Sequence, residues 1–294
     1  MNTSYFNSRF FGKLFIYSAL ALFAMYFLVP LYVMVMTSFK TLPEIRSGNI
    51  ASLPASLNLE AWKIAWSGDV NAQCQQGVSC QGLSVYFWNS VLMAVPAVLI
   101  STVIGALNGY VLTKWRFKGS NIFFGMLLLG CFIPFQVILL PMSQVLGELG
   151  LSGTISGLIF VHVVYGIAFT TLFFRNYYIT IPTALVQAAQ IDGAGFWLIF
   201  RRIILPLSVP IIVVSVIWQF TQIWNDFLFG VIYSDSQSQP VMVALNNLVN
   251  TTTGIKRYNV DMAGAFIAGI PTLLVYIIAG KYFVRGLTAG AVKG

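Results

Sequence analysis

Six long apolar stretches run through the sequence, near residues 14–36, 85–112, 122–142, 154–174, 207–232 and 262–283. Each is long enough to cross roughly 30 Å of hydrocarbon at about 1.5 Å of helical rise per residue. The composition agrees, because 58% of the residues are hydrophobic, only 8% are charged and the mean hydropathy is +0.82. These values lie outside the range of soluble domains. The sequence therefore predicts an all-α polytopic membrane protein, in which one transmembrane domain (1–294) contains six transmembrane helices.

The first apolar stretch, Leu14 to Met36, resembles a secretory signal peptide only in its position. It is too long for the apolar core of a signal peptide, and no small-residue cleavage site follows it. We therefore expect this stretch to be retained as the first membrane span.

The basic residues predict the orientation of the chain. An even number of spans places both termini on one side, and Lys and Arg are enriched on the cytoplasmic side of membrane proteins. Of the sixteen basic residues, five fall on the side opposite the termini: Lys40, Arg46, Lys63, Lys256 and Arg257. The other eleven lie on the side of the termini, so both termini are expected in the cytoplasm. The net charge of +8 then reflects topology, and no nucleic-acid partner is expected.

Two longer polar segments are expected on the outer side. Residues 38–84 contain Cys74 and Cys80, which enclose five residues. An oxidising compartment would allow them to form a small disulfide loop, and a free pair is the alternative. The second segment, 233–261, is rich in Ser, Gln, Asn and Thr, which suits a partner protein or a sugar better than lipid.

A water-facing helix-turn-helix is expected at residues 180–206, between the fourth and fifth stretches. Pro182 suits the first turn of its first helix, and Gly193 can adopt a positive φ and end that helix. One face of this helix is formed at helical spacing by Leu185, Ala188, Ala189 and Asp192. The two alanines leave room for close approach by another surface.

The second helix of this hairpin is amphipathic, with Arg201 and Arg202 turned away from its apolar face. That face is formed by Phe196, Ile199, Phe200, Ile203 and Ile204. Two interpretations are open from the chemistry alone. The hairpin is a docking surface for a cytosolic partner, or its second half is an interfacial helix lying on the headgroups.

The stretch "QAAQIDGAGFWLIFRRIILPLSVP" resembles the EAA loop of ATP-binding-cassette importer permeases, the coupling helix that fits a cleft on a cytosolic ATPase. The family pattern is Glu-Ala-Ala, then a glycine after three residues, and a later Leu-Pro. The chain departs from the pattern at Gln187, which replaces the acid and can form hydrogen bonds but no salt bridge. The resemblance assigns ATPase coupling to Gln187, Ala188, Ala189, Asp192, Gly193, Ala194, Phe196, Phe200 and Pro206.

The C-terminal sequence "KYFVRGLTAGAVKG" resembles the tail of MalG-like carbohydrate importer permeases, which reaches toward the ATPase dimer. The cytoplasmic tail is expected at 284–294, with Arg285, Gly286 and Lys293 as its candidate contacts. "FTTLFFRNYY", "WQFTQIWNDFLFG" and "VALNNLVNTTTG" are most similar to permeases of proteobacterial glucose/mannose importers. The resemblance implies a sugar permease of the bacterial inner membrane.

The same resemblance implies the partners. No G-x-x-x-x-G-K-[ST] motif occurs, so the chain has no phosphate-binding loop of its own and is not expected to be an enzyme. ATP and Mg²⁺ would be bound by two separate cytoplasmic ATPase subunits, and no cofactor or metal is expected on this chain. A second homologous permease subunit, a periplasmic sugar-binding protein and membrane lipid complete the expected partners. In the maltose-type family, most sugar contacts come from the sister permease.

A possible sugar path is expected along the fifth stretch. Trp218, Gln222, Asn225 and Asp226 would lie roughly on one helical face, and a neutral hydroxylated ligand needs such hydrogen-bonding and aromatic groups. The alternative is that Asp226 caps the outer end of the span and the rest packs against a partner subunit. An ionised acid at mid-bilayer would cost about 2.5–3.5 kcal/mol, so a deep Asp226 would need a polar partner.

His162, the one histidine of the chain, falls near the middle of the fourth stretch. A lone histidine is a poor metal site, so packing, a hydrogen bond between helices or a ligand contact are its candidate roles. Ion-coupled secondary transporters usually have acids or histidines deep in their spans. Asp226 and His162 are the only such candidates in this sequence. An ion-coupled secondary transporter is therefore one alternative to the sugar importer, and an importer permease for another sugar or polyol is the other. An intramembrane enzyme would need paired acids, a metal cluster or a nucleophile with its base, and the sequence has none of these.

Overall fold

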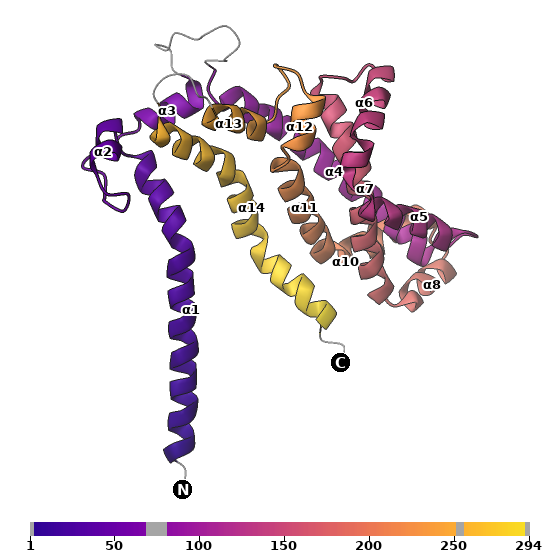
Figure 1. Ribbon diagram of the computed structural model, residues 1–294. Helices are drawn as coiled ribbons and strands as arrows, with labels where there is room; N and C mark the ends of the chain where they lie inside the picture. Colours follow the sequence, from indigo (N-terminus) through magenta and orange to yellow (C-terminus); the bar gives the residue numbers. More distant parts are fainter. Residues whose placement is uncertain (1–2, 69–80, 251–255, 292–294) are drawn as a thin grey trace. The chain divides into compact units, whose positions relative to one another are not determined.

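The computed structural model describes residues 3–68, 81–250 and 256–291 (Figure 1). Every regular element in these ranges is a helix. The one β-type contact among them is an isolated parallel bridge between Gly153 and Ser234. The chain divides into two compact units, residues 1–83 with 248–267 and residues 84–247 with 268–294.

The first unit contains α1 (Thr3–Ser38), α2 (Leu42–Ser47), α3 (Glu60–Ser67) and the beginning of α14 (Tyr258–Ala291). Lys40 is buried, and its ammonium group donates hydrogen bonds to Ser52 Oγ (3.0 Å) and to the carbonyl of Asn49 (3.3 Å). Asn259 of α14 donates to the carbonyl of Lys40 over 3.0 Å. These bonds fold the polar segment after α1 against α14.

Aromatic stacking strengthens the same unit. Trp62 of α3 lies between Phe39 and Phe266, with ring centroids 5.6 Å and 6.0 Å away. At the start of α2, a capping box joins Thr41 and Glu44. The Glu44 carboxylate also accepts a hydrogen bond from the amide of Ala55 over 2.8 Å. Residues 38–67, expected only as a polar outer segment, therefore have a defined fold.

The second unit is built around α4 (Ser84–Lys114) and α7 (Ile155–Thr180), which pack along each other (Figure 1). Gly109 of α4 faces Phe174 and Arg175 of α7 so closely that a Cβ there would lie 2.7 Å from Phe174 Cβ and 2.9 Å from Arg175 N. Helices in membranes pack through small residues in this way. α11 (Val209–Trp224) packs against both α4 and α7.

The third apolar stretch, expected as one span at 122–142, is broken into two helical parts. α5 (Ser120–Phe132) is followed by a 3-10 turn (Phe135–Ile138) and α6 (Leu139–Glu148), and the two parts meet at 96°. The break lies at Ile133, which is extended (φ −69°, ψ 121°). Pro134 causes it, because a proline disfavours helical geometry in the preceding residue.

The fifth stretch also differs from the expected helix at 207–232. α11 ends at Trp224, and α12 (Leu228–Tyr233) and α13 (Val241–Val249) are separate short helices. Before α11, a helix over Phe196–Leu207 meets it at 76°. Ser208 lies between the two parts, and Pro210 lies in the first turn of α11.

Four described helical segments are long and apolar enough to cross a membrane, namely Phe10–Ser38, Ser84–Lys114, Ile155–Thr180 and Tyr258–Gly280. The count rises to six if each of the two bent pairs is a single span. The all-helical membrane fold expected from the sequence is therefore confirmed. α14 continues without a break to Ala291, so the segment expected as a tail from 284 is helical to that residue.

Candidate functional site

Residues 180–206, called the elbow below, form two helices joined by a tight turn. The first helix, α8 (Thr183–Ile191), begins one residue after Pro182 and is followed by Asp192 and Gly193. Gly193 has φ +82°, a conformation that costs a non-glycine residue roughly 1–2 kcal/mol. The sequence therefore needs a glycine at this position to end α8.

Two backbone hydrogen bonds complete this helix end. The amide of Gly193 donates to the carbonyl of Gln190 (3.0 Å), and the amide of Ala194 donates to the carbonyl of Ala189 (2.9 Å). This pair is the Schellman arrangement, which satisfies the last carbonyls of a helix. Within the described residues, the Asp192 side chain accepts no backbone hydrogen bond.

The second helix of the elbow is irregular. It comprises α9 (Phe196–Ile199), a π-helical segment (Phe200–Ile204) and α10 (Leu205–Leu207), with Pro206 in the first turn of α10. π-Helical turns are rare and contain one extra residue relative to an α-turn. The sequence does not predict this segment, because the hydrophobic spacing of five residues does not distinguish a π-helix from an α-helix.

The inner face of the elbow is held by aromatic residues of α4 and α7. Tyr110 of α4 is fully buried, and its ring lies 4.9 Å from that of Phe196 and 5.4 Å from that of Phe200. Lys114 donates a hydrogen bond to the carbonyl of Ile181. The rest of this core consists of Ala106, Phe174, Tyr178, Val186, Ile199 and Ile204. The elbow is therefore packed firmly onto the ends of two long helices.

The outer face of the elbow remains open. Gln187, Ala188 and Asp192 are exposed, whereas Ala189 and Ala194 are half-buried. Ile191, at the tip of α8, is 86% exposed. An apolar tip beside alanines and an acid, all on a rigid support, is suited to contact with another protein. Arg201 and Arg202 are also exposed, as expected.

The structure does not bring all candidate residues to the elbow. Arg285 and Gly286 lie in α14. Lys293 and the candidate disulfide, Cys74 and Cys80, lie outside the described residues. Cys131 is a free thiol in α5, half-buried there.

The expected sugar path along the fifth stretch is interrupted. Trp218 is half-buried in α11, where its ring lies 4.6 Å from that of Phe169. Gln222 is exposed near the end of α11, and Asn225 is exposed directly after it. α11 ends at Trp224. The amide of Asn225 still donates to the carbonyl of Thr221, four residues back (3.2 Å), whereas the amide of Asp226 donates to the carbonyl of Ile223, three residues back (3.3 Å). The helical face expected for these four residues therefore ends before Asp226, and their role in a sugar path stays a prediction.

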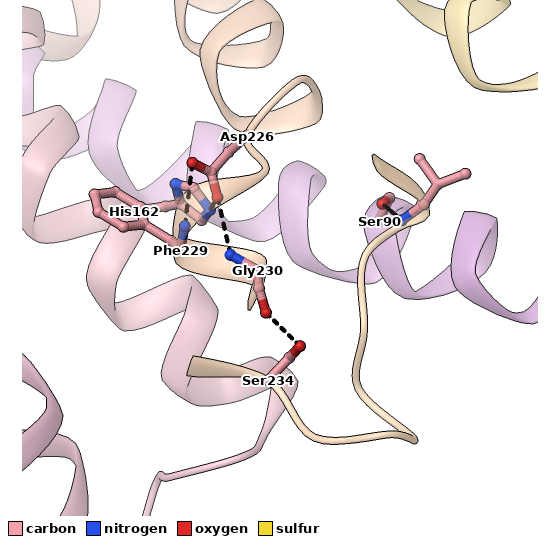
Figure 2. A network of polar contacts seen from close by, with 7 residues as sticks. Ser90, His162, Asp226, Phe229, Gly230 and Ser234 are labelled. Atoms are coloured by element: carbon pink, nitrogen blue, oxygen red, sulfur yellow. Dashed lines mark hydrogen bonds and ion pairs between the residues drawn. The ribbon is translucent and has the colours of Figure 1, made fainter. Parts of the chain in front are cut away.

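Asp226 instead lies at the start of α12. Its carboxylate accepts hydrogen bonds from the amides of Phe229 (3.4 Å) and Gly230 (3.1 Å), as Figure 2 shows. These are amides of the first turn of a helix, which have no partner within the helix. The carboxylate therefore stabilises the start of α12. That Asp226 caps the outer end of the fifth span, with the rest packed against a partner subunit, stays the alternative.

His162 of α7 faces this carboxylate. Its Nε2 lies 3.8 Å from Asp226 Oδ2, and its ring lies 5.5 Å from that of Phe229 (Figure 2). The two residues are 64 positions apart in the sequence, so no local pattern indicated the pair. Among the described residues, no group of three or more His, Cys, Asp or Glu could hold a metal ion.

Further polar contacts fix the segment after α12. Asn89 of α4 donates hydrogen bonds to the carbonyls of Gln237 (2.7 Å) and Gln239 (3.1 Å). The amide of Val241 donates to Ser90 Oγ over 2.8 Å. α12 and the loop that follows it are therefore anchored to α4.

Comparison with known proteins identifies the chain. Residues 82–287 match the family model described as "Binding-protein-dependent transport system inner membrane component". The xylose/arabinose import permease protein XacI of Haloferax volcanii is 32% identical over an alignment of 296 positions, which covers 94% of this chain and 92% of that protein. The chain belongs to this family of permeases.

A second permease relative, the glucose import system permease protein GlcU of Saccharolobus solfataricus, is 28% identical over 289 aligned residues. The alignment covers 95% of each of the two permeases. Among solved structures, a chain of a bacterial ABC transporter involved in alginate import is similar with a TM-score of 0.79 at 20% identity. The match covers 94% of this permease and 98% of that chain, and it supports the fold.

Proposed function

We propose that this permease forms half of the pathway by which an ATP-driven importer carries a sugar across the bacterial inner membrane. The family membership and the names of the relatives, which include xylose, arabinose and glucose permeases, support this function. The whole chain is taken as a single transmembrane domain with both termini in the cytoplasm. The other half of the pathway is a second, homologous permease subunit.

The elbow is the proposed site of coupling to a separate ATPase. The observation that carries this proposal is the contrast between its two faces: Ile191 is 86% exposed at the tip, while Ile199 and Ile204 behind it are fully buried. A partner that moves the tip would therefore move the ends of α4 and α7 as well. Gln187, Ala188, Ala189, Asp192, Gly193 and Ala194 form the proposed contact, with Phe196, Phe200 and Pro206 behind them.

The cycle proposed for this permease is alternating access between two states of the bundle. Closure of two cytoplasmic ATPases on ATP and Mg²⁺ would move the paired elbows, and the long helices would transmit that motion to the sugar path. Arg285, Gly286 and Lys293 are proposed to contact the ATPases. A periplasmic sugar-binding protein would deliver the sugar on the other side, where residues 233–261 are proposed to face it.

A monosaccharide of the glucose/mannose type is the proposed substrate. Sequence similarity to glucose/mannose permeases in three segments supports it, and so does the named glucose permease among the relatives. Trp218, Gln222, Asn225 and Asp226 are proposed to border its path. Gln222 and Asn225 are exposed just before α12, where their side chains could form hydrogen bonds with the hydroxyl groups of the sugar.

The test is reconstitution in liposomes of the permease with its partner permease, ATPases and binding protein. ATP-dependent uptake of glucose or mannose is expected only when all components are present. The control omits the ATPases while keeping both permeases and an ion gradient. Sustained uphill uptake in that control would contradict the proposal and indicate an ion-coupled secondary transporter.

A further inference from the structure

His162 and Asp226 face each other across a gap that no hydrogen bond closes (Figure 2). The separation of 3.8 Å between Nε2 and Oδ2 exceeds the upper limit of about 3.2 Å for an N–H···O bond. The His162 side chain is 5% exposed, and its Nε2 has no hydrogen-bond partner among the described residues. A buried polar group without a hydrogen-bond partner is unusual and costs free energy. We therefore expect another group to bind Nε2 of His162.

The carboxylate of Asp226, on the other side of the gap, can accept more hydrogen bonds than it receives from the backbone. Asp226 accepts one backbone amide at each oxygen, from Phe229 and from Gly230. An ionised carboxylate has about four acceptor positions. The side chain is 16% exposed, and its neighbour Asn225 is exposed. Asp226 can therefore accept one further hydrogen bond from a group that approaches from the open side.

We infer that this gap binds one hydroxyl group of the transported sugar, an inference that rests on the proposed function. Two hydrogen bonds of about 2.8 Å from one oxygen would span the observed 3.8 Å with an angle of about 85° at that oxygen. The hydroxyl accepts from the Nε2–H of neutral His162 and donates to Oδ2 of Asp226. The buried Nε2 of His162 then has a partner.

The groups on the two sides of the gap favour a hydroxyl group as the ligand. With the imidazole proton on Nε2, one side of the gap donates and the other accepts, so an occupant that bonds to both has to be an acceptor and a donor through the same atom. A hydroxyl is both, whereas an ammonium group only donates and a carboxylate only accepts. The site is therefore expected to favour neutral hydroxylated solutes over charged ones.

The surrounding residues complete the site. Tyr165 follows His162 by three positions on α7. Its hydroxyl is also buried without a partner among the described residues, and its ring lies 4.9 Å from that of Phe229. Phe229 in turn contacts the His162 ring. An aromatic side chain thus lies beside the gap, and a tyrosine packs on that same aromatic ring; sugar sites combine aromatic and polar groups in this way.

The experiment uses the complete importer in liposomes with its binding protein. Calorimetry on the binding protein first selects its best ligand among D-glucose, D-mannose, D-xylose and L-arabinose. Uptake of that sugar and of its monodeoxy derivatives is then measured at concentrations that saturate the binding protein. The variants are His162→Gln, Asp226→Asn and, as a matched control, Asp235→Asn, because Asp235 also accepts backbone amides after α12.

We expect the wild-type importer to carry one monodeoxy derivative about tenfold less efficiently than the parent sugar, because one hydrogen bond to a charged group is lost. Asp226→Asn and His162→Gln should each lower uptake of the parent by about tenfold and lower uptake of that derivative no further. Such non-additivity identifies a direct contact. Asp235→Asn should change uptake of every sugar by a common factor.

Equal losses for the parent and all derivatives in both variants would overturn the inference, because His162 and Asp226 would then only hold α12 in place. Co-purification of the four kinds of subunit reports assembly, and if one variant fails to assemble, the other decides. If the wild-type importer takes up none of these sugars with ATP, the proposed function fails and the inference fails with it. The two failures are distinguishable, because failure of the proposed function is seen in the wild type alone, whereas failure of the inference is seen by comparing the variants.

Discussion

The hydroxyl of Ser208 lies 2.9 Å from the hydroxyl of Tyr178, and both side chains are fully buried. Tyr178 precedes the elbow at the end of α7, and Ser208 follows it at the start of α11. The hydrogen bond therefore joins the two helices at the points where the elbow leaves and re-enters the bundle. Movement of the elbow has to involve both helices together.

Tyr178→Phe should weaken this connection. Loss of one buried hydrogen bond costs about 1 kcal/mol, which corresponds to a fall in Tm of about 2–4 °C for a chain of this size. Sugar transported per ATP hydrolysed should also fall. Tyr276→Phe is the control, because Tyr276 is 47% exposed in α14. Equal Tm values for the two variants would contradict the structural role of the pair.

Gly193→Val should disturb the turn of the elbow. A β-branched residue disfavours the φ of +82° at this position, although a Cβ would meet no other atom within 4 Å. We expect weaker co-purification of the ATPase and more ATP hydrolysed per sugar transported. Gly195→Ala is the matched control, since Gly195 has φ −81° and equal space. Identical behaviour of the two variants would count against the elbow as the coupling site.

Gly109→Ala should force α4 and α7 apart. Its added Cβ would lie 2.7 Å from Phe174 Cβ and 2.9 Å from Arg175 N, and overpacking of this kind costs about 1–3 kcal/mol. Thermal unfolding of the purified complex should therefore occur at a lower temperature. Gly125→Ala, where a Cβ meets nothing within 4 Å, should leave the unfolding temperature unchanged. A stable Gly109→Ala complex would mean that the two helices adjust freely.

Acid should loosen the loop after α12. Asp235 accepts hydrogen bonds from the amides of Gln237 and Ser238 and from Ser238 Oγ, each 2.9 Å long. These bonds, above all those from Ser238, lower the pKa of Asp235 below its usual value. A lowered pKa in the folded state stabilises the loop above the unfolded pKa of about 4, and this stabilisation is lost as the pH falls through the lowered pKa.

Amide hydrogen exchange of residues 236–239, corrected for intrinsic rates, measures this effect. Protection in the wild type should exceed that in Asp235→Asn at pH 6, and the difference should disappear at pH values below the lowered pKa. A difference that persists unchanged in acid would show that the carboxylate charge does not stabilise the loop.

Cys74 and Cys80 are predicted to form a disulfide if the segment between the first two spans is periplasmic. The test is alkylation of the purified protein before and after reduction, followed by mass spectrometry of the peptide that contains both residues. Alkylation only after reduction is the expected result. Alkylation of both thiols without reduction would indicate a free pair.

The sequence predicted those features that depend on local chemistry. Gly193 ends a helix because of its φ, and the apolar spacing from Phe196 to Ile204 identifies a buried face. The membrane fold followed from the length of the apolar stretches. In each case, neighbouring residues in the chain contain the information.

The remaining features depend on residues that are distant in the sequence or on a change in helix type. The pair formed by His162 and Asp226 needs the packing of α7 against α12, which no spacing reveals. The bend at Ile133 did have a signal, Pro134, but prolines are tolerated within other helices of this chain, such as Pro96 in α4. Composition alone therefore could not distinguish a kink from a break.

The π-helical segment Phe200–Ile204 gives the elbow a fixed length as well as a fixed shape. Removing one residue from Leu205–Leu207, directly after this segment, would rotate everything downstream by about 100° relative to it. Ser208 would then turn away from Tyr178, and α11 would present different side chains to α4. Evolution of this region is thus expected to accept exchanges of side chain far more readily than insertions or deletions.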